Sequence, residues 1–258
     1  MTLDYEKYDA GHWSQDTDVD SAVSNYIKLY EDVYNQFNVE RIVSAVPTGG
    51  TLRILDYGGG IGMLSVALAE LGHDVTLVDA APGAVEAAGV FAARQGVVFK
   101  SICTADVCEL PVAELYDVIV SKDLIEHVHN DEALVKQFFL RLKPKGVLVL
   151  TTQNKFCMNY LIEAGVRKIL RPHDKWMGWD RTHLRFYTSR SLSRICTAAG
   201  FKRPTFRSAY IIPYKLLGVI FPAFDAKKPS ILSSIDKALA KLFVFGRCGW
   251  NIMVIAEK

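Results

Sequence analysis

The sequence lacks the cysteine patterns that build a disulfide framework or a structural zinc site. Only 5 of its 258 residues are cysteines, an odd number, and no two of them form a Cys-x-x-Cys pair. Reduced, unpaired thiols are typical of the cytoplasm. We therefore expect a cytoplasmic protein.

Targeting segments and long apolar runs are also missing. The most apolar stretch, residues 210–224, is interrupted by Pro213, Lys215 and Pro222 and is too short to cross a bilayer. The N-terminus has no apolar core, which argues against a secretory signal or transit peptide and predicts a mature chain starting near Met1. Its first 20 residues are instead acidic, with Asp4, Glu6, Asp9, Asp16, Asp18 and Asp20. Peripheral contact with a membrane through an amphipathic helix stays open as an alternative.

Net charge is small, at +2, but its distribution along the chain is uneven. Residues 1–140 contain 8 Lys or Arg against 22 Asp or Glu, and residues 141–258 contain 22 against 6, so the two parts carry formal charges of −14 and +16. Such asymmetry predicts that the two parts meet different partners or meet each other.

Half of the residues are hydrophobic and 22% are charged, which is typical of a globular protein with a sizeable core. Short apolar runs alternate with helical patterns, and this alternation predicts a doubly wound α/β fold with a mostly parallel sheet. The predicted strands are residues 52–57, 75–79, 97–102, 118–121 and 147–152, and the predicted helices between them are 61–71, 82–95 and 131–142.

The flanking segments complete a single predicted domain over residues 1–258. We expect one long helix over residues 18–46 within an N-terminal cap (1–50), followed by a cofactor-binding core (51–153). Two inserts, 154–187 and 213–248, are expected to cover the substrate. The remaining predicted elements are helices at 158–170, 188–199 and 231–243 and strands at 203–212 and 251–256.

A glycine turn follows the first predicted strand. Gly58, Gly60 and Gly62 alternate with other residues, whereas a dinucleotide fingerprint would require a small residue where Met63 stands. The strand ends with Asp56, whose carboxylate would repel a pyrophosphate but suits a ligand with an ammonium and a sulfonium. S-adenosyl-L-methionine is such a ligand, and a nicotinamide oxidoreductase is disfavoured.

Acids at the ends of the next two strands fit the same cofactor. Asp79 is placed to accept hydrogen bonds from the ribose hydroxyls, and Asp106 could accept one from the adenine amino group. Their neighbours Ala80 and Val107, together with Ser121 at the end of the fourth strand, complete the predicted cofactor site.

These segments resemble the class I S-adenosylmethionine-dependent methyltransferases from Leu52 to the C-terminus. The matching residues include the glycine turn, YDVIV at 116–120, DLIEHV at 123–128 and LKPKG at 142–146. This resemblance implies a seven-stranded sheet whose last strand is antiparallel. Within the family, HLRFYT at 183–188 is similar to the ubiquinone-biosynthesis O-methyltransferase group, whereas Lys122 and Gln153 depart from its usual pattern.

Two histidines are candidates for the base that accepts a proton from a hydroxyl acceptor. His127 follows the fourth strand, and His183 lies in the insert expected to cover the same sheet edge. Each could instead have a structural role, orienting the Glu126 loop or fixing the insert. The resemblance also implies a divalent metal in some relatives, with Asp123, Glu126 and His127 as the alternative ligands to our prediction of no metal.

The insert supplies the predicted acceptor-binding residues, which are Trp176, Trp179, Arg181, Arg185 and Tyr187. Its further basic residues suggest an anionic acceptor, although they could equally be solvated or pair with the acidic part. These are Lys155, Arg167, Lys168, Arg171 and Lys175.

We predict methyl transfer to a small-molecule hydroxyl. Methylation of nitrogen or carbon and a catalytically silent cofactor-binding subunit remain alternatives. No nucleic acid is expected as a partner, because residues 151–154 read TTQN and lack the Asn-Pro-Pro-aromatic or Asp-Pro-Pro-aromatic pattern used on flipped bases.

Overall fold

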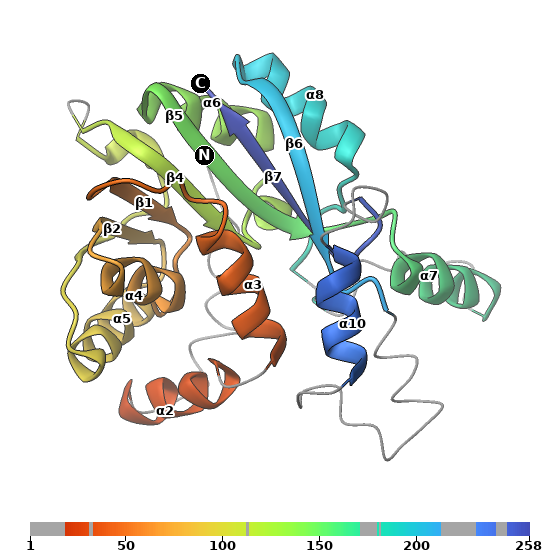
Figure 1. Cartoon of the computed structure of the whole chain (residues 1–258), viewed down its shortest axis with the longest axis horizontal. Coiled ribbons are helices and arrows are strands. Elements are labelled where there is room, and N and C mark those ends of the chain that lie inside the picture. Colours follow the sequence, from red (N-terminus) through yellow and green to blue (C-terminus); the bar gives the residue numbers. More distant parts are fainter. Residues whose placement is uncertain are drawn as a thin grey trace.

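The computed structural model describes residues 19–30, 33–111, 114–170, 180, 182–212, 231–240 and 247–258. Seven strands form one sheet in the order β3-β2-β1-β4-β5-β7-β6 (Figure 1). β7 runs antiparallel to both β5 and β6, and the pairs among β1 to β5 are parallel, which confirms the predicted doubly wound sheet. The strands are β1 (Arg53–Tyr57), β2 (Asp74–Asp79), β3 (Lys100–Cys103), β4 (Tyr116–Lys122), β5 (Leu142–Gln153), β6 (Lys202–Ala209) and β7 (Asn251–Glu257).

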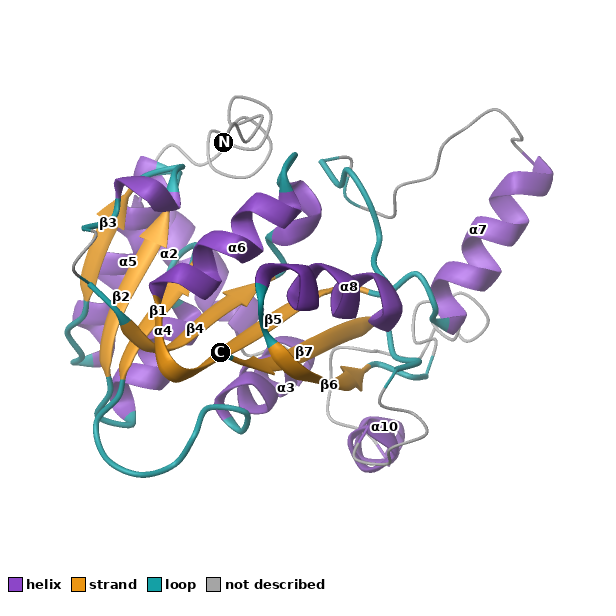
Figure 2. Ribbon diagram, turned by 90° about the horizontal axis from the view of Figure 1, so that it is seen from above, coloured by secondary structure: helices purple, strands orange, loops and turns teal. Residues whose placement is uncertain are grey.

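Helices cover both faces of the sheet (Figure 2). Alternate residues along the buried strands point to opposite faces, so Leu55 and Ile119 join one apolar cluster while Ile54 and Val118 join another. The first cluster contains residues of α6 (Asp131–Arg141) and α8 (Ser189–Ala199), and the second contains residues of α3 (Val33–Val43) and α4 (Met63–Glu70). The structure also contains α5 (Pro82–Gln95) and the short 3₁₀ helices η1 (Val107–Glu109) and η2 (Ile125–His127).

The prediction of one helix over residues 18–46 is wrong, because the structure has two, α2 (Val19–Tyr30) and α3. The apolar residues of this segment serve two different surfaces. Val23 of α2 packs against Ile61 and Phe91, whereas Ile42 of α3 packs in the cluster under the sheet. The two helices differ in direction (Figure 1), so each can bury its own apolar face.

The third strand also begins later than predicted, at Lys100 rather than residue 97. Val97 and Phe99 pack with the cluster around α5 instead of pairing in the sheet. The local sequence shows an apolar run but not where sheet pairing begins.

The two inserts contain the helices α7 (Met158–Leu170) and α10 (Ile231–Ala240), both within predicted ranges. α10 is anchored to the end of β6, because the Asp236 side chain accepts hydrogen bonds from the backbone N–H groups of Ile211 (2.8 Å) and Ile212 (3.1 Å). In Figure 2, α7 extends away from the sheet, so the expected cover over the substrate stays a prediction. No helix in the described part of the chain is both long enough and apolar enough to span a membrane.

Candidate active site

The glycine turn between β1 and α4 has a backbone that only glycine adopts easily. Gly58 has φ 77°, and a Cβ on it would lie 2.9 Å from the Leu124 side chain. Gly60 has φ 55° and open space on its Cβ side, while its N–H donates a hydrogen bond of 2.9 Å to Asp79. The turn therefore exposes backbone at the carboxyl edge of the sheet, where ligands of open α/β folds bind.

Asp79 at the end of β2 fixes this turn as well as facing a cavity. Its Oδ2 accepts from the Gly60 N–H and its Oδ1 accepts from the Ala81 N–H, each at 2.9 Å. Burial raises the pKa of Asp79, and these backbone hydrogen bonds oppose that rise. One carboxylate thus connects the ends of the first two strands.

Asp56 lies deeper than the sequence suggested, with an exposed fraction of 1%. Its Oδ2 accepts a hydrogen bond of 2.7 Å from the hydroxyl of Ser65 in α4. Burial raises the pKa of Asp56 to about 6, with Asp79 adding to the rise and the Ser65 hydrogen bond opposing it. At neutral pH this site still favours the anion, which remains available to a cationic ligand.

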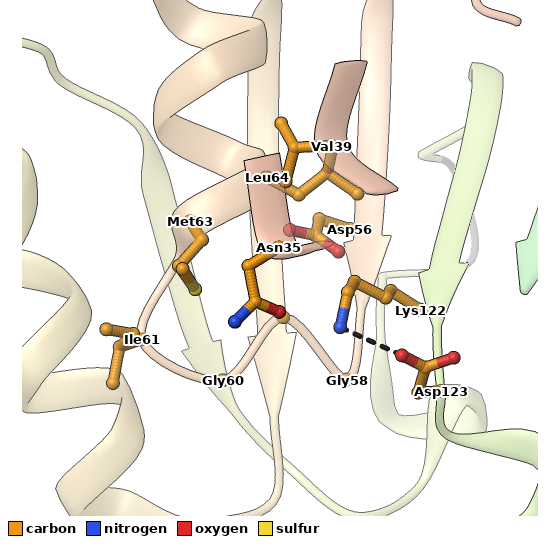
Figure 3. Close-up of a pocket in the computed structure, with 11 residues that line it drawn as sticks. Asn35, Val39, Asp56, Gly58, Gly60, Ile61, Met63, Leu64, Lys122 and Asp123 are labelled. Carbon is orange, nitrogen blue, oxygen red and sulfur yellow. Dashed lines mark hydrogen bonds and ion pairs between the residues drawn. The ribbon is translucent and has the colours of Figure 1, made fainter. Parts of the chain in front are cut away.

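Two neighbouring cavities open at this edge and share Gly58, Lys122 and Asp123. The first lies over the glycine turn and is bordered by Asn35 and Val39 of α3 (Figure 3). It is lined by Asn35, Val39, Asp56, Gly58, Gly59, Gly60, Ile61, Met63, Leu64, Lys122 and Asp123. The second extends toward β2 and β3, and its lining adds Tyr57, Val78, Asp79, Ala80, Thr104, Ala105 and Leu124. Of the predicted cofactor residues, Asp56, Gly58, Gly60, Asp79 and Ala80 line these cavities.

The other predicted cofactor residues have contacts within the fold. Gly62 has φ 81° and precedes α4, and a Cβ there would meet the Phe99 ring at 3.0 Å. The Asp106 carboxylate caps η1 by accepting from the Cys108 N–H at 2.8 Å, and Val107 is fully buried. The Ser121 hydroxyl donates 2.9 Å to the Tyr57 carbonyl. These four residues are not among those that line the two cavities, and their contact with a cofactor stays a prediction.

Sequence reasoning missed the contribution of α3. Asn35 and Val39 line the first cavity, although both lie in a segment whose pattern predicted only a helix with an apolar stripe. The polar side chain of Asn35 in this helix was the one feature of the sequence that could have indicated a contact with the cavity.

A second group of polar side chains gathers just beyond β4. Ligand atoms of Glu126, His127 and His183 all lie within 4.8 Å of one another, and the two imidazole ring centroids are 4.8 Å apart. All three side chains are buried, with exposed fractions of 0%, 8% and 5%. The structure therefore brings together both predicted catalytic histidines, which are separated in the sequence by the whole of α6, β5 and α7.

Glu126 is the acid of this cluster. Its Oε2 accepts 2.7 Å from the Thr152 hydroxyl, whereas its buried Oε1 has no hydrogen-bond partner among the described residues. Burial and the neighbouring Asp123 carboxylate raise the pKa of Glu126 to about 8. The carboxyl group is therefore largely protonated at neutral pH in the absence of a cation.

His127 is held by a short chain of hydrogen bonds. The Thr182 hydroxyl lies 2.9 Å from His127 Nδ1 and 2.6 Å from Asp180 Oδ1. Since a hydroxyl has one proton and the Asp180 carboxylate takes it, Nδ1 is assigned as the donor and Nε2 carries the lone pair. Burial, with His183 adding to its effect, lowers the pKa of His127 to about 4, which keeps the ring neutral at pH 7.

Asp180 also contacts His183, with Oδ2 lying 3.8 Å from Nε2. Burial would raise the pKa of Asp180, but the Thr182 hydrogen bonds and the nearby histidines hold it below its usual value. An anionic carboxylate thus lies beside the His183 ring and is linked to His127 through the Thr182 hydroxyl.

Of the alternative metal ligands Asp123, Glu126 and His127, only the last two belong to the cluster found among the described residues. The Asp123 carboxylate instead forms an ion pair with Lys122 at 2.9 Å and accepts a hydrogen bond of 2.7 Å from the Asn251 side chain. Among the described residues, His183 takes its place in the cluster. One carboxylate with two imidazoles, in which Glu126 Oε1 has no hydrogen-bond partner among the described residues, fits a zinc-like ion better than magnesium, which prefers oxygen ligands.

The predicted acceptor-binding residues divide into two sets. Arg185 pairs with Asp131 at 2.9 Å and donates 2.8 Å to the His129 carbonyl. Tyr187 is 2% exposed and donates 2.7 Å to the same Asp131. Both side chains join α6 to the segment before α8, and their contact with the acceptor stays a prediction. Trp176, Trp179 and Arg181 lie outside the described residues.

Known proteins share this fold and this sequence pattern. The profile of the methyltransferase domain family matches residues 29–203. The ubiquinone biosynthesis O-methyltransferase of Rickettsia canadensis is 28% identical over 68% of this chain and 69% of its own length, and that of Rickettsia prowazekii is 32% identical over 56% and 54%. Phosphoethanolamine N-methyltransferase 2 of Haemonchus contortus, solved with S-adenosylhomocysteine, superposes with a TM-score of 0.63 at 17% identity over 97% of this chain and 58% of that one.

The family match covers more than half of the chain, which therefore belongs to the methyltransferase domain family and is an enzyme. Its identification from sequence as a class I S-adenosylmethionine-dependent methyltransferase is confirmed. The sheet order and the antiparallel β7 agree with that class.

Proposed function

We propose that this enzyme transfers the methyl group of S-adenosylmethionine to a hydroxyl group of a small molecule. The observation that carries the proposal is the buried cluster of Glu126, His127 and His183, which follows β4 at the edge where the cofactor cavities open. A base next to the methyl donor is what a hydroxyl acceptor requires, because the hydroxyl must lose its proton as the new bond forms.

The two cavities divide the cofactor between them. The ribose and adenine are assigned to the cavity lined by Asp79, Ala80 and Thr104, and the methionine part to the cavity over the glycine turn. Asp56 and Asp123 both line the cavity over the glycine turn, where their carboxylates would stabilise the positive charges of the bound cofactor. This assignment puts the methyl group near the shared residues Gly58, Lys122 and Asp123.

Methyl transfer is an in-line displacement on a carbon that positive sulfur already activates. The protein mainly aligns the two reactants and excludes water. His183, oriented by Asp180, or His127 with its lone pair on Nε2 accepts the hydroxyl proton as the oxygen attacks. The neutral state of His127 at pH 7 suits this role. A divalent ion held by the cluster would lower the pKa of a bound hydroxyl.

Oxygen as the methylated atom is supported by the relatives, which are named O-methyltransferases. Release of S-adenosylhomocysteine would be measured over matched panels of phenols, alcohols and amines, with a labelled methyl group to locate the product atom. We expect turnover with phenols or alcohols and no turnover with the matched amines. Cofactor binding without turnover in any panel would contradict the proposal and favour a silent cofactor-binding subunit.

A further inference from the structure

Lys122 is a cation in the middle of the predicted cofactor site. It ends β4, its side chain is 29% exposed, and it lines both cavities. In Figure 3 its side chain reaches toward Asn35, its nitrogen lies between Asp56 and Gly58 in this view, and a dashed line joins that nitrogen to Asp123. A basic residue here requires a reason, because the reacting sulfonium of the cofactor is itself positive.

The anionic partner of Lys122 is fixed from three other elements. Asp123 has φ 51° and accepts hydrogen bonds from Asn251 at 2.7 Å and from Thr151 at 3.2 Å. Arg41 of α3 donates in turn to both the side chain and the backbone carbonyl of Asn251. Strands β5 and β7 and helix α3 thus hold the Asp123 carboxylate, and Asp123 holds the Lys122 ammonium.

The charges around the first cavity match those of an amino-acid group. The anions of Asp56 and Asp123 and the cation of Lys122 give a formal charge of about −1. S-adenosylmethionine carries an ammonium, a sulfonium and a carboxylate, with a sum of about +1. Asp123, Glu126 and Asp56 raise the pKa of Lys122 although burial acts against them, so the ammonium stays charged.

We propose that Lys122 binds the α-carboxylate of S-adenosylmethionine and makes this site selective for the intact methionine end of the cofactor. The inference rests on the proposed function. Asp123 positions the ammonium, and the bound carboxylate becomes its second anionic partner, which also screens Lys122 from the sulfonium. The acids of the cavity are then left to the two cationic groups of the cofactor.

The test compares S-adenosylmethionine with decarboxylated S-adenosylmethionine by calorimetry. Wild-type protein is expected to bind the intact cofactor about tenfold or more tightly than the decarboxylated one. Lys122→Met should weaken binding of the intact cofactor by about 10 to 100-fold and change binding of the decarboxylated one by less than about threefold. The preference for the intact cofactor over the decarboxylated one should therefore be lost when the Lys122 charge is removed, and Lys122→Arg should retain part of this preference.

Lys143 provides the matched control. It forms an ion pair of the same 2.9 Å length with Asp117 at the opposite end of β4, so Lys143→Met removes an equivalent ion pair away from the cavities. Equal weakening of both ligands in Lys122→Met, or a loss confined to the acceptor KM, would overturn the inference. If Lys122→Met fails to fold, the wild-type protein alone still tests the inference. Equal wild-type affinity for the intact and the decarboxylated cofactor would overturn it. Wild-type protein that binds neither ligand would contradict the proposed function itself.

Discussion

The first five strands and the segments after β5 build the site in different ways. On the cofactor side, β1, β2 and β4 end at one edge, and their ends supply the glycine turn, Asp79 and Lys122. Beyond β5, the contributions come from contacts between distant segments, such as His183 against His127 and Asn251 against Asp123. The proposed cofactor site is therefore a product of sheet topology, whereas the proposed catalytic cluster of Glu126, His127 and His183 depends on how the later segments dock.

The charge asymmetry follows the same division. Several ion pairs join a basic residue after position 140 to an acid before it, namely Lys143 with Asp117, Arg185 with Asp131 and Lys237 with Glu40. Some of the charges of the acidic part and the basic part therefore pair with each other, as one of the alternatives from the sequence predicted.

The largest expected effect would break the catalytic cluster while leaving the cofactor side intact. His183→Ala should lower kcat by about 10² or more with little change in cofactor affinity, because a base acts on the acceptor and not on the sulfonium. Steady-state kinetics and calorimetry on the same preparation measure both quantities. The exposed His129 provides a control in His129→Ala. If His127→Ala shows the large loss instead, the two roles are reversed, and normal kcat in both variants would contradict a histidine base.

The second effect would break the cofactor side alone. Asp79→Ala should weaken the binding of S-adenosylmethionine by about 1.5 to 3 kcal/mol. The substitution removes the hydrogen-bond acceptors for the ribose hydroxyls and also the acceptor of the Gly60 N–H. Asp74→Ala at the other, exposed end of β2 is the matched control. Calorimetry that finds equal affinity for Asp79→Ala and wild type would contradict the ribose assignment.

The contrast between the two sides also explains what the sequence could predict. Strands β1, β2 and β4 and the glycine turn follow from local apolar runs and spacing, and Asp79 follows from its place at a strand end. No local pattern connects Asp123 with Asn251, 128 positions away, or Arg41 with Asn251, 210 positions away. The same limit applies to Asn35 and Val39, whose cavity contacts depend on the direction of α3.

A pH experiment would sharpen the view of the cluster. The pKa of Glu126 is raised from 4.5 to about 8 in the folded protein, so this group stabilises the fold at low pH and that stability is lost as pH rises toward 8. The pKa of His127 is lowered to about 4, so its contribution to the pH dependence lies between about pH 4 and 6.5. Above about pH 6.5 the contribution of His127 no longer changes with pH, so a pH dependence that Glu126→Gln removes in this window is assigned to Glu126.

Glu126→Gln mimics the protonated acid in that window. Its free energy of unfolding relative to wild type should rise by about 1 to 2 kcal/mol between pH 6.5 and 9, because only the wild-type carboxyl must ionise. Urea unfolding at the two pH values gives the difference, with the exposed Glu132→Gln as control. A difference that stays constant with pH would contradict the raised pKa.

The smallest expected effect concerns the ion pair that joins the two parts at Arg185. Its Nη1 lies 2.9 Å from Asp131, which also accepts from Tyr187, and the two charged side chains are 32% and 13% exposed. A partly exposed pair of this kind contributes about 1 kcal/mol. Arg185→Met and Asp131→Asn should therefore each lower Tm by about 2 to 4 °C, and the double variant should lose less than the sum of the two.

Because these contacts lie within the fold, acceptor KM should stay unchanged and kcat/KM should respond little to salt from about 0.05 to 0.3 M. A raised KM in Arg185→Met without a loss of stability would instead support Arg185 as an acceptor-binding residue, and a steep salt dependence would show that the basic residues steer an anionic acceptor.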